Sequence, residues 1–415
     1  MAGSDLAAWR PSVVVGSTYL AQGLVACLGP MMLGVLAQLG TPLEDQVGVL
    51  ASGALPWVLK FALGLLLDLG PSWPLRVRSL VSLILLGGAA LATWGLARAW
   101  APGVPESLTE LGFVWLALNF AMAMQDTLVD ALALDLLADR RALAATGMGL
   151  GHAIGFGLLG SWWIGGTIVR EGLAAGLELA ALALAILAAT PLLLWSPGRP
   201  VAARERPSSR RDRSPSDWLW LLAIPLLGLI GMLAPNITGA VAAEFLFVEL
   251  RWEFADYAIA LLPLGAIAGV IGALTCGSLL ARVGPAWASA SMALLLGVLW
   301  LVFASLSSRW SEIWLIRSLA FGEGFLQAAL LVGLHALALL AAARSPLPIT
   351  GFVFAMAALN LPRVLGPLLA PTMVEHGWIA VFTGCGALQI LAGLGLLPLI
   401  RRTRSAGDPP ARGIH

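Results

Sequence analysis

The amino-acid sequence predicts an all-α membrane protein whose twelve transmembrane helices form two six-helix halves. Three observations lead to this fold class: an extreme hydrophobic composition, twelve apolar runs of membrane-spanning length, and a pattern repeated between the halves. Of the 415 residues, 59% are hydrophobic and only 11% are charged, and the mean hydropathy is +0.89. This composition excludes an ordinary water-soluble domain, and the net charge of +1 gives no reason to expect a nucleic-acid partner.

Twelve apolar runs are long enough to cross a membrane, since a transmembrane helix needs about 20 residues. The first run is too long for a cleavable signal and is followed by further spans, so we expect it to remain in the membrane. The predicted spans are 12–38, 47–69, 76–98, 110–137, 142–168, 173–195, 217–244, 255–281, 286–306, 312–341, 348–373 and 378–400.

A polar stretch at 196–216, rich in Arg, Pro and Ser, is the longest interruption between spans. We predict a solvated linker there, between an N-terminal half (1–195) and a C-terminal half with a tail (217–415). Arginines in the loops predict the orientation, because cytoplasmic loops carry an excess of basic residues. With a cytoplasmic N-terminus, seventeen basic residues fall inside and four outside, so both termini are expected in the cytoplasm.

The two halves share short patterns at matching loops. Span two is followed by Gly70-Pro71 and span eight by Gly284-Pro285, while Thr146-Gly147 and Thr350-Gly351 stand 204 residues apart at the start of spans five and eleven. Equivalent spans in the same orientation indicate a parallel repeat. Two such halves, related by an axis along the membrane normal, are the arrangement of the major facilitator fold.

Two carboxylates lie inside span four. Asp126 and Asp130 are four residues apart and therefore share one helix face. A charge near the bilayer centre costs about 2.5–3.5 kcal/mol on insertion scales, so this face must look at protein, water or a solute. Lys60, the one lysine of the sequence, lies at similar depth in span two. We predict that it pairs with Asp126 or Asp130; the alternative is that it extends toward the inner surface and Asp68.

The second half offers polar groups in spans ten and eleven. Glu323 lies between two glycines, and Asn360 and Arg363 flank Pro362 at mid-membrane. Proline-interrupted polar stretches often line substrate sites, so we expect these three side chains to contact a solute. A purely structural Glu323–Arg363 pair is the alternative. Arg317 is nearer the outer surface and is expected to extend toward it.

Other polar and small residues within spans have structural interpretations. His152 and His335 each stand alone in a span, which is more typical of a helix–helix hydrogen bond than of a proton carrier. The three cysteines are far apart in apolar runs and are interpreted as small core residues. The spacing Gly147–Gly151–Gly155 predicts a face for close helix packing.

The sequence shows no metal-ligand spacing, nucleotide-binding glycine loop or catalytic constellation, so no cofactor, metal or enzymatic activity is expected. Near the predicted inner surface, Asp135 and Asp139 approach Arg140 and Arg141, which favours a gate or a surface pair. With Asp68, the two arginines form the predicted gate.

Several segments resemble the AmpG-like muropeptide permeases and the related acetyl-coenzyme A transporters of the major facilitator superfamily. The resemblance rests on residues 19–24 (Tyr-Leu-Ala-Gln-Gly-Leu), 55–61 (Leu-Pro-Trp-Val-Leu-Lys-Phe) and 125–131 (Gln-Asp-Thr-Leu-Val-Asp-Ala) in the first half. In the second half it rests on 360–367 and 375–378. It covers both halves but is denser in the first.

The resemblance implies proton-driven uptake across a bacterial inner membrane, with Lys60, Asp126 and Asp130 as the coupling residues. Gln22 and Gln125 lie in the motifs that carry it and are expected to contact solute. The muropeptide permeases usually have two further spans, and some twelve-span relatives take up siderophores. From the resemblance, an anhydromuropeptide is the expected substrate. Because some twelve-span relatives take up siderophores, a siderophore is the alternative.

We expect a monomer that alternates access around a cavity between the halves, lined by Lys60, Asp126, Asp130, Glu323, Asn360 and Arg363. A rival class is a membrane assembly factor or sensor on a transporter scaffold, because a fold does not determine a function. Sealing of all these residues in tight pairs would favour that rival. A membrane enzyme is a weaker rival.

Overall fold

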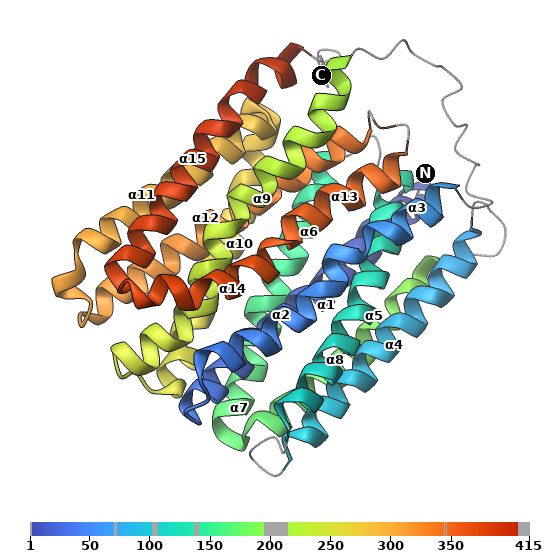
Figure 1. Ribbon diagram of the computed structural model, residues 1–415. Helices are drawn as coiled ribbons and strands as arrows, with labels where there is room; N and C mark the ends of the chain where they lie inside the picture. Colours follow the sequence, from blue (N-terminus) through green and yellow to red (C-terminus); the bar gives the residue numbers. More distant parts are fainter. Residues whose placement is uncertain are drawn as a thin grey trace.

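The computed structural model is a bundle of long helices, and it describes residues 2–69, 73–101, 107–136, 141–194, 215–343, 345 and 347–405 (Figure 1). Regular structure in these residues is helical throughout, with no strand. Twelve spans in this part of the chain are long and apolar enough to cross a membrane, as the sequence predicts. Their ends differ from the predicted ends by no more than five residues.

The first half contains six spans, several built from more than one helical element. Its elements are α1 (Ala2–Gln38), α2 (Leu43–Leu59), α3 (Phe61–Leu69), α4 (Leu75–Ala99), α5 (Leu108–Leu136), α6 (Arg141–Ile154), η2 (Gly155–Ile164), α7 (Gly165–Glu171), α8 (Leu173–Leu187) and η3 (Thr190–Leu194).

The second half repeats this organisation. Its elements are α9 (Pro215–Glu244), η4 (Phe245–Glu249), η5 (Asp256–Leu261), α10 (Leu262–Val283), α11 (Pro285–Ser305), η6 (Ser307–Arg309), α12 (Ile313–Ala342), α13 (Pro348–Asn360), α14 (Pro362–Glu375) and α15 (Trp378–Ser405). Most of the predicted linker at 196–216 lies outside the described residues.

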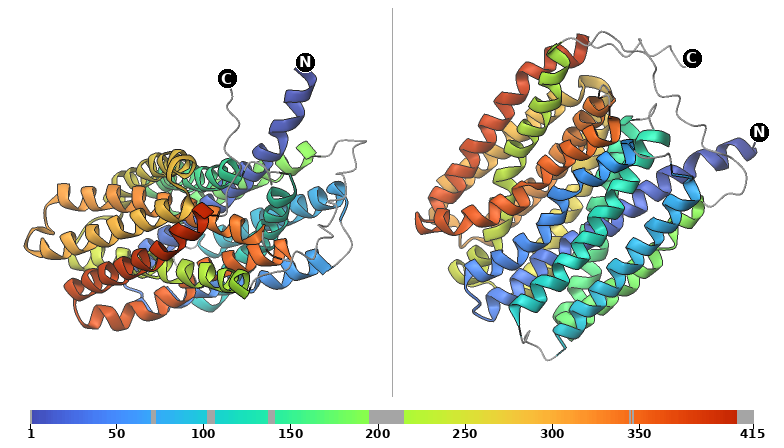
Figure 2. Two further views of the ribbon diagram at one scale, coloured as in Figure 1. Left: turned by 90° about the horizontal axis from the view of Figure 1, so that it is seen from above. Right: turned by 45° about the vertical axis from the view of Figure 1, so that its right-hand side comes forward.

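The two halves lie side by side, with the first half at the lower right of Figure 1 and the second at the upper left. Helices α2, α3 and α6 of the first half contact α10, α12, α13 and α14 of the second. Helix α1 begins and α15 ends at the same end of the bundle, here called the terminal end (Figures 1 and 2). The turns at Gly40, Gly172 and Gly377 mark the opposite end.

Spans two and eleven are both interrupted, and they face each other across the boundary between the halves. Span two breaks at Lys60, which caps α2 and whose amide bonds back to Pro56. Span eleven breaks at Leu361, directly before Pro362. Proline removes a backbone donor and disturbs the preceding turn, which accounts for a break at these places. The interruptions place Lys60 and the Asn360–Arg363 stretch near the middle of their spans.

Glycines allow α1 to approach α6 and η2 closely. A Cβ atom at Gly155 would clash with the backbone of Leu20, and one at Gly151 would clash with the carbonyl of Gly16. Gly23 of α1 meets the backbone of His152 in the same way. The predicted packing face is therefore correct for Gly151 and Gly155. It is wrong for Gly147, which has no neighbouring atom within 4 Å of a Cβ position.

Candidate functional site

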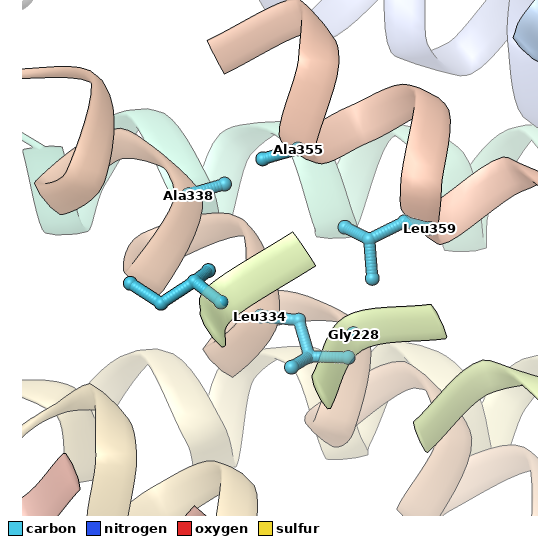
Figure 3. A pocket seen from close by; sticks show the side chains of 6 residues that line it. Gly228, Leu334, Ala338, Ala355 and Leu359 are labelled. Atoms are coloured by element: carbon cyan, nitrogen blue, oxygen red, sulfur yellow. The ribbon is translucent and has the colours of Figure 1, made fainter. Parts of the chain in front are cut away.

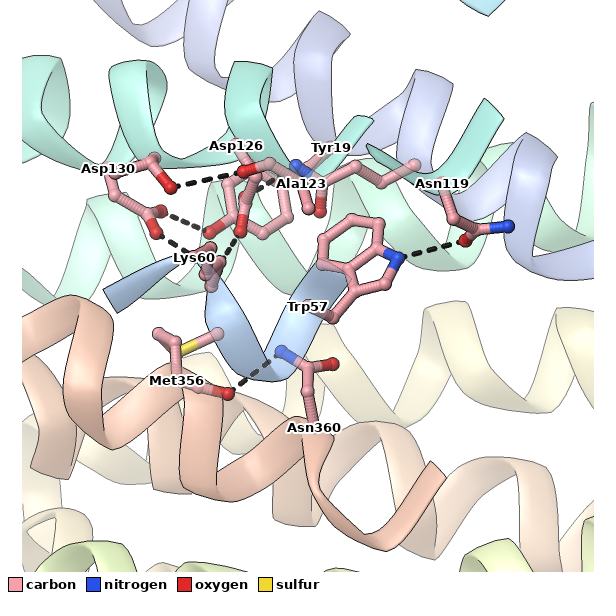
Figure 4. Close-up of polar contacts among 11 residues, drawn as sticks. Tyr19, Trp57, Lys60, Asn119, Ala123, Asp126, Asp130, Met356 and Asn360 are labelled. Carbon is pink, nitrogen blue, oxygen red and sulfur yellow. Dashed lines mark hydrogen bonds and ion pairs between the residues drawn. The ribbon is translucent and has the colours of Figure 1, made fainter. Parts of the chain in front are cut away.

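A buried lysine and two buried carboxylates form the centre of the candidate site. Lys60 Nζ contacts Asp126 Oδ2 directly and lies 3.4 Å from Asp130 Oδ2 (Figure 4). The exposed fractions of the three residues are 0%, 1% and 0%. The predicted pairing is therefore confirmed as a contact with both carboxylates, and the alternative that Lys60 extends toward Asp68 is wrong.

Two side chains of α1 complete the hydrogen bonding of the carboxylates. Tyr19 Oη donates to Asp130 Oδ1 at 2.7 Å, and Gln22 Nε2 donates to Asp126 Oδ1 at 2.5 Å. All four carboxylate oxygens thus accept a hydrogen bond or contact the ammonium group. Buried charges are tolerated only when they are paired and hydrogen-bonded in this way.

Local structure explains why these groups converge. Asp126 and Asp130 are one turn apart on α5, and Tyr19 and Gln22 are three residues apart on α1, so each pair projects from one helix face. The break after α2 places Lys60 between these helices. Gln125 instead donates to Thr18 Oγ1 at 3.0 Å, which holds α5 against α1 beside the cluster.

Trp57 connects this cluster to the second half. Its indole Nε1 donates to Asn119 Oδ1 at 2.9 Å. Lys60 Nζ lies 5.6 Å from the centre of its ring and Arg363 Cζ lies 5.4 Å from it, both within cation–π distance. Sequence reasoning missed Trp57 as a site residue; its position three residues before Lys60 was the available signal. Asn360, one turn before Arg363, donates to the carbonyl of Met356 at 2.8 Å.

Glu323 has partners of its own in the second half. Its Oε1 accepts hydrogen bonds from Thr238 at 2.9 Å and from Gln327 at 2.8 Å. Arg363 contacts Trp57 rather than Glu323, so the alternative of a structural Glu323–Arg363 pair is not what the structure shows. Glu323 and Arg363 are both partly exposed, in contrast to the sealed Lys60 cluster.

The two isolated histidines border the site. The ring of His335 lies edge-on to that of Tyr19, with 6.0 Å between the ring centres. His335 is buried, and its Nδ1 has no hydrogen-bond partner in the described part of the chain, so the predicted helix–helix hydrogen bond is not seen for this atom. His152 lies on α6, where its backbone meets Gly23.

Of the predicted gate residues, the structure describes the contacts of Asp68. Its Oδ2 accepts from the amide of Thr350 at 2.6 Å and from the hydroxyl of Thr350 at 2.7 Å, which connects the halves at the terminal end. Arg140 and the side chain of Arg141 lie outside the described residues, as does Asp139. Asp135 pairs with Arg78 at 2.7 Å, an ion pair between α4 and α5 that sequence reasoning did not foresee.

The predicted cavity lined by Lys60, Asp126 and Asp130 is not what the structure shows, because these groups are sealed from solvent. One crevice between α9, α12 and α13 has an empty volume of about 160 Å³ (Figure 3). Its lining is apolar and includes none of the predicted site residues: Ile224, Gly228, Leu334, Ala338, Ala355 and Leu359.

Contacts between the halves at both ends account for the sealing. At the terminal end, Asp68 holds Thr350, and Gly64 lies against Val353. At the opposite end, a Cβ atom at Gly34 would lie 2.8 Å from the ring of Phe254. The described residues contain no group of three or more His, Cys, Asp or Glu side chains that could hold a metal ion.

Comparison with solved structures identifies the architecture. The nucleoside transporter NupG aligns with 95% of this chain and 99% of its own, at a TM-score of 0.60 and 15% identity. The human organic anion transporter MFSD10 aligns with 93% of this chain and 99% of its own, at a TM-score of 0.64 and 17% identity. This chain has the major facilitator fold. The predicted fold class is thereby confirmed, and at these identities the likeness concerns the fold alone.

Sequence comparisons leave the branch of the major facilitator fold open. No family model matches the chain. A folate-biopterin transporter from Synechocystis is 35% identical over 113 residues, which are 25% of this chain and 22% of that protein. The chain thus matches about a fifth of the length of this curated relative. The resemblance to muropeptide permeases stays a prediction.

Proposed function

We propose that this chain is a secondary active transporter that takes up an amphiphilic, partly anionic solute together with protons. The observation that carries the proposal is the sealed Lys60–Asp126–Asp130 cluster at mid-span, beside the boundary between two halves of the major facilitator fold. We further expect a monomer in a bacterial inner membrane, with the terminal end cytoplasmic.

The cluster offers a route from protonation to movement. A proton on Asp126 or Asp130 would discharge one carboxylate and weaken its attraction to Lys60, and this attraction is large in a low-dielectric interior. Lys60 lies at the break of span two, which faces span eleven of the other half. Loosening the cluster would therefore change the packing between the halves, while Asp68, with Arg140 and Arg141, serves as the gate at the terminal end.

The substrate we favour is an anhydromuropeptide, which fits the family resemblance, with contacts from Gln22, Gln125, Glu323, Asn360 and Arg363. A siderophore remains the alternative within the same class. A pterin carboxylate is a further candidate, because the relative from Synechocystis is named a folate-biopterin transporter. The partly exposed Arg363 suits an acidic group on any of these solutes.

A membrane assembly factor or sensor is the alternative class, and the complete sealing of the three charged groups is the observation that favours it. A transporter must open this cluster to solvent in another conformation, whereas a structural protein need not. Solute uptake separates the two classes.

The test is uptake in inner-membrane vesicles under an imposed proton gradient. Labelled anhydromuropeptide, ferric siderophore and folate are compared in the original protein and in Asp126→Asn. Exposed Asp45 provides the matched control, Asp45→Asn. Gradient-driven uptake that survives in the control and is lost in Asp126→Asn supports the proposal. Uptake that persists without a gradient, or in Asp126→Asn, contradicts proton coupling through this cluster.

A further inference from the structure

The guanidinium group of Arg363 lies at the boundary between the halves and makes no direct ion pair with any residue that the structure describes. It projects from α14 to within 5.4 Å of the Trp57 ring on α2. Within the described part of the chain, this side chain also makes no hydrogen bond to another residue. A cation held at membrane depth without a partner is costly and is usually functional.

Arg363 and the Lys60 cluster share one electrostatic environment. Trp57 lies within cation–π distance of both cations, and Arg363 is within electrostatic reach of Asp126. Two cations, Lys60 and Arg363, therefore accompany two carboxylates, Asp126 and Asp130, and the four charges sum to zero. The other titratable groups facing them are Tyr19 from α1, His152 from α6 and His335 from α12.

We propose that Arg363 binds a carboxylate group of the solute beside Trp57, and that Asp130 takes up one proton for each negative charge bound. This inference rests on the proposed transport function and specifies its substrate class as carboxylate-bearing solutes. Arginine presents parallel N–H donors that match both oxygens of a carboxylate, so a free guanidinium at this place selects such a group over a neutral amide.

The proton follows from the charge sum. A bound carboxylate would leave the buried site with one net negative charge, which is unfavourable in a low-dielectric surrounding. One proton from solution added to an Asp oxygen forms a neutral carboxylic acid and restores the sum to zero. Asp130 is the better acceptor, because Lys60 contacts Asp126 directly but lies 3.4 Å from Asp130.

The test uses purified full-length protein in detergent without any gradient, with benzoate and its neutral counterpart benzamide as probes. Titration calorimetry measures binding, and a pH dye in weak buffer measures proton uptake. We expect benzoate to bind with about one proton taken up per molecule, and benzamide not to bind. Because binding is coupled to the uptake of one proton, the affinity for benzoate should depend on pH. It should fall roughly tenfold for each unit that the pH rises, in the range where Asp130 is deprotonated in the free protein.

Two variants make the result specific. Arg363→Gln should weaken benzoate binding at least tenfold, whereas Arg317→Gln, at an exposed position of α12, should leave it unchanged. Asp130→Asn should still bind benzoate but without proton uptake and without the pH dependence. A merely damaged site would lose binding altogether rather than lose its pH dependence.

Each contrary outcome overturns the inference. These are no benzoate binding by the original protein, equal binding of benzamide, full binding by Arg363→Gln, or benzoate binding without proton uptake. The proposed function fails separately: a protein that binds benzoate with a proton but moves no solute in vesicles is not a transporter, and a transporter of neutral solutes contradicts only the carboxylate site.

Discussion

Asp68 of the first half caps the N-terminus of α13 in the second half by accepting the amide and hydroxyl hydrogens of Thr350 at 2.6 and 2.7 Å. The helix has no side-chain cap of its own, since Leu347 and Pro348 begin it. A carboxylate at a helix N-terminus satisfies free amides and interacts favourably with the helix dipole. This contact therefore stabilises the closed terminal end.

Removing this cap should open the terminal end more often. A hydrogen bond to a charged group contributes about 1.5–3 kcal/mol, so Asp68→Ala should raise the open fraction roughly tenfold or more. The measurement is the labelling rate of a cysteine at Val353, a buried position packed against Gly64. Asp45→Ala is the matched control. Equal labelling rates in Asp68→Ala and in the control would show that this contact does not hold the end closed.

The opposite end should respond to a larger side chain at Gly34. A Cβ atom there would lie 2.8 Å from the Phe254 ring and 3.3 Å from the Phe247 ring, so Gly34→Leu should keep the halves apart at this end. We expect Gly34→Leu to abolish solute transport. A thiol reagent should also react faster with a cysteine placed at Phe254 in this variant. Gly48→Leu, at a position with no neighbour within 4 Å, is the control. Normal uptake by Gly34→Leu would contradict closure at this place.

The buried charges predict a characteristic stability pattern. Lys60→Gln leaves two carboxylates without their cation, and breaking a buried pair costs about 3–5 kcal/mol. The triple variant Lys60→Gln, Asp126→Asn, Asp130→Asn removes all three charges of the sealed cluster, leaves the partly exposed Arg363 unchanged, and should recover most of the lost thermal stability. The melting temperature of each variant in detergent is the measurement. If the triple variant melts as low as Lys60→Gln, the cluster is held by packing rather than by charge.

Part of the site was predictable because few arrangements satisfy its residues. Asp126 and Asp130 had to share a helix face, and Lys60 was the one lysine at the same depth. A buried charge needs a partner, so pairing of Lys60 with Asp126 or Asp130 was the prediction, with extension toward Asp68 as the alternative. Asp68 belongs to the predicted gate and Thr350 to the repeated Thr-Gly pattern, but their contact depends on how the halves meet, which the sequence pattern does not encode.

The remaining features depend on distances between helices that spacing does not encode. The hydrogen bond from Tyr19 to Asp130 requires α1 and α5 at a particular separation. The position of Arg363 over Trp57 requires span eleven beside span two. The sealing of Lys60 depends on how closely the two halves pack around it, which residue spacing does not encode.

The close approach of α1 to η2 gives a final prediction. Gly155→Val would place a side chain in the backbone of Leu20, which cannot move away as a flexible side chain could. Overpacking typically costs about 1–3 kcal/mol, and a backbone clash should reach the upper part of that range. Because α1 also carries Tyr19 and Gln22, displacing it should weaken both hydrogen bonds to the carboxylates, so proton-driven uptake should fall together with the melting temperature. Gly147→Val, on the same helix face two turns earlier but next to open space, should change neither. Equal effects of Gly155→Val and Gly147→Val on uptake and melting temperature would show that the contact with α1 does not explain the role of Gly155.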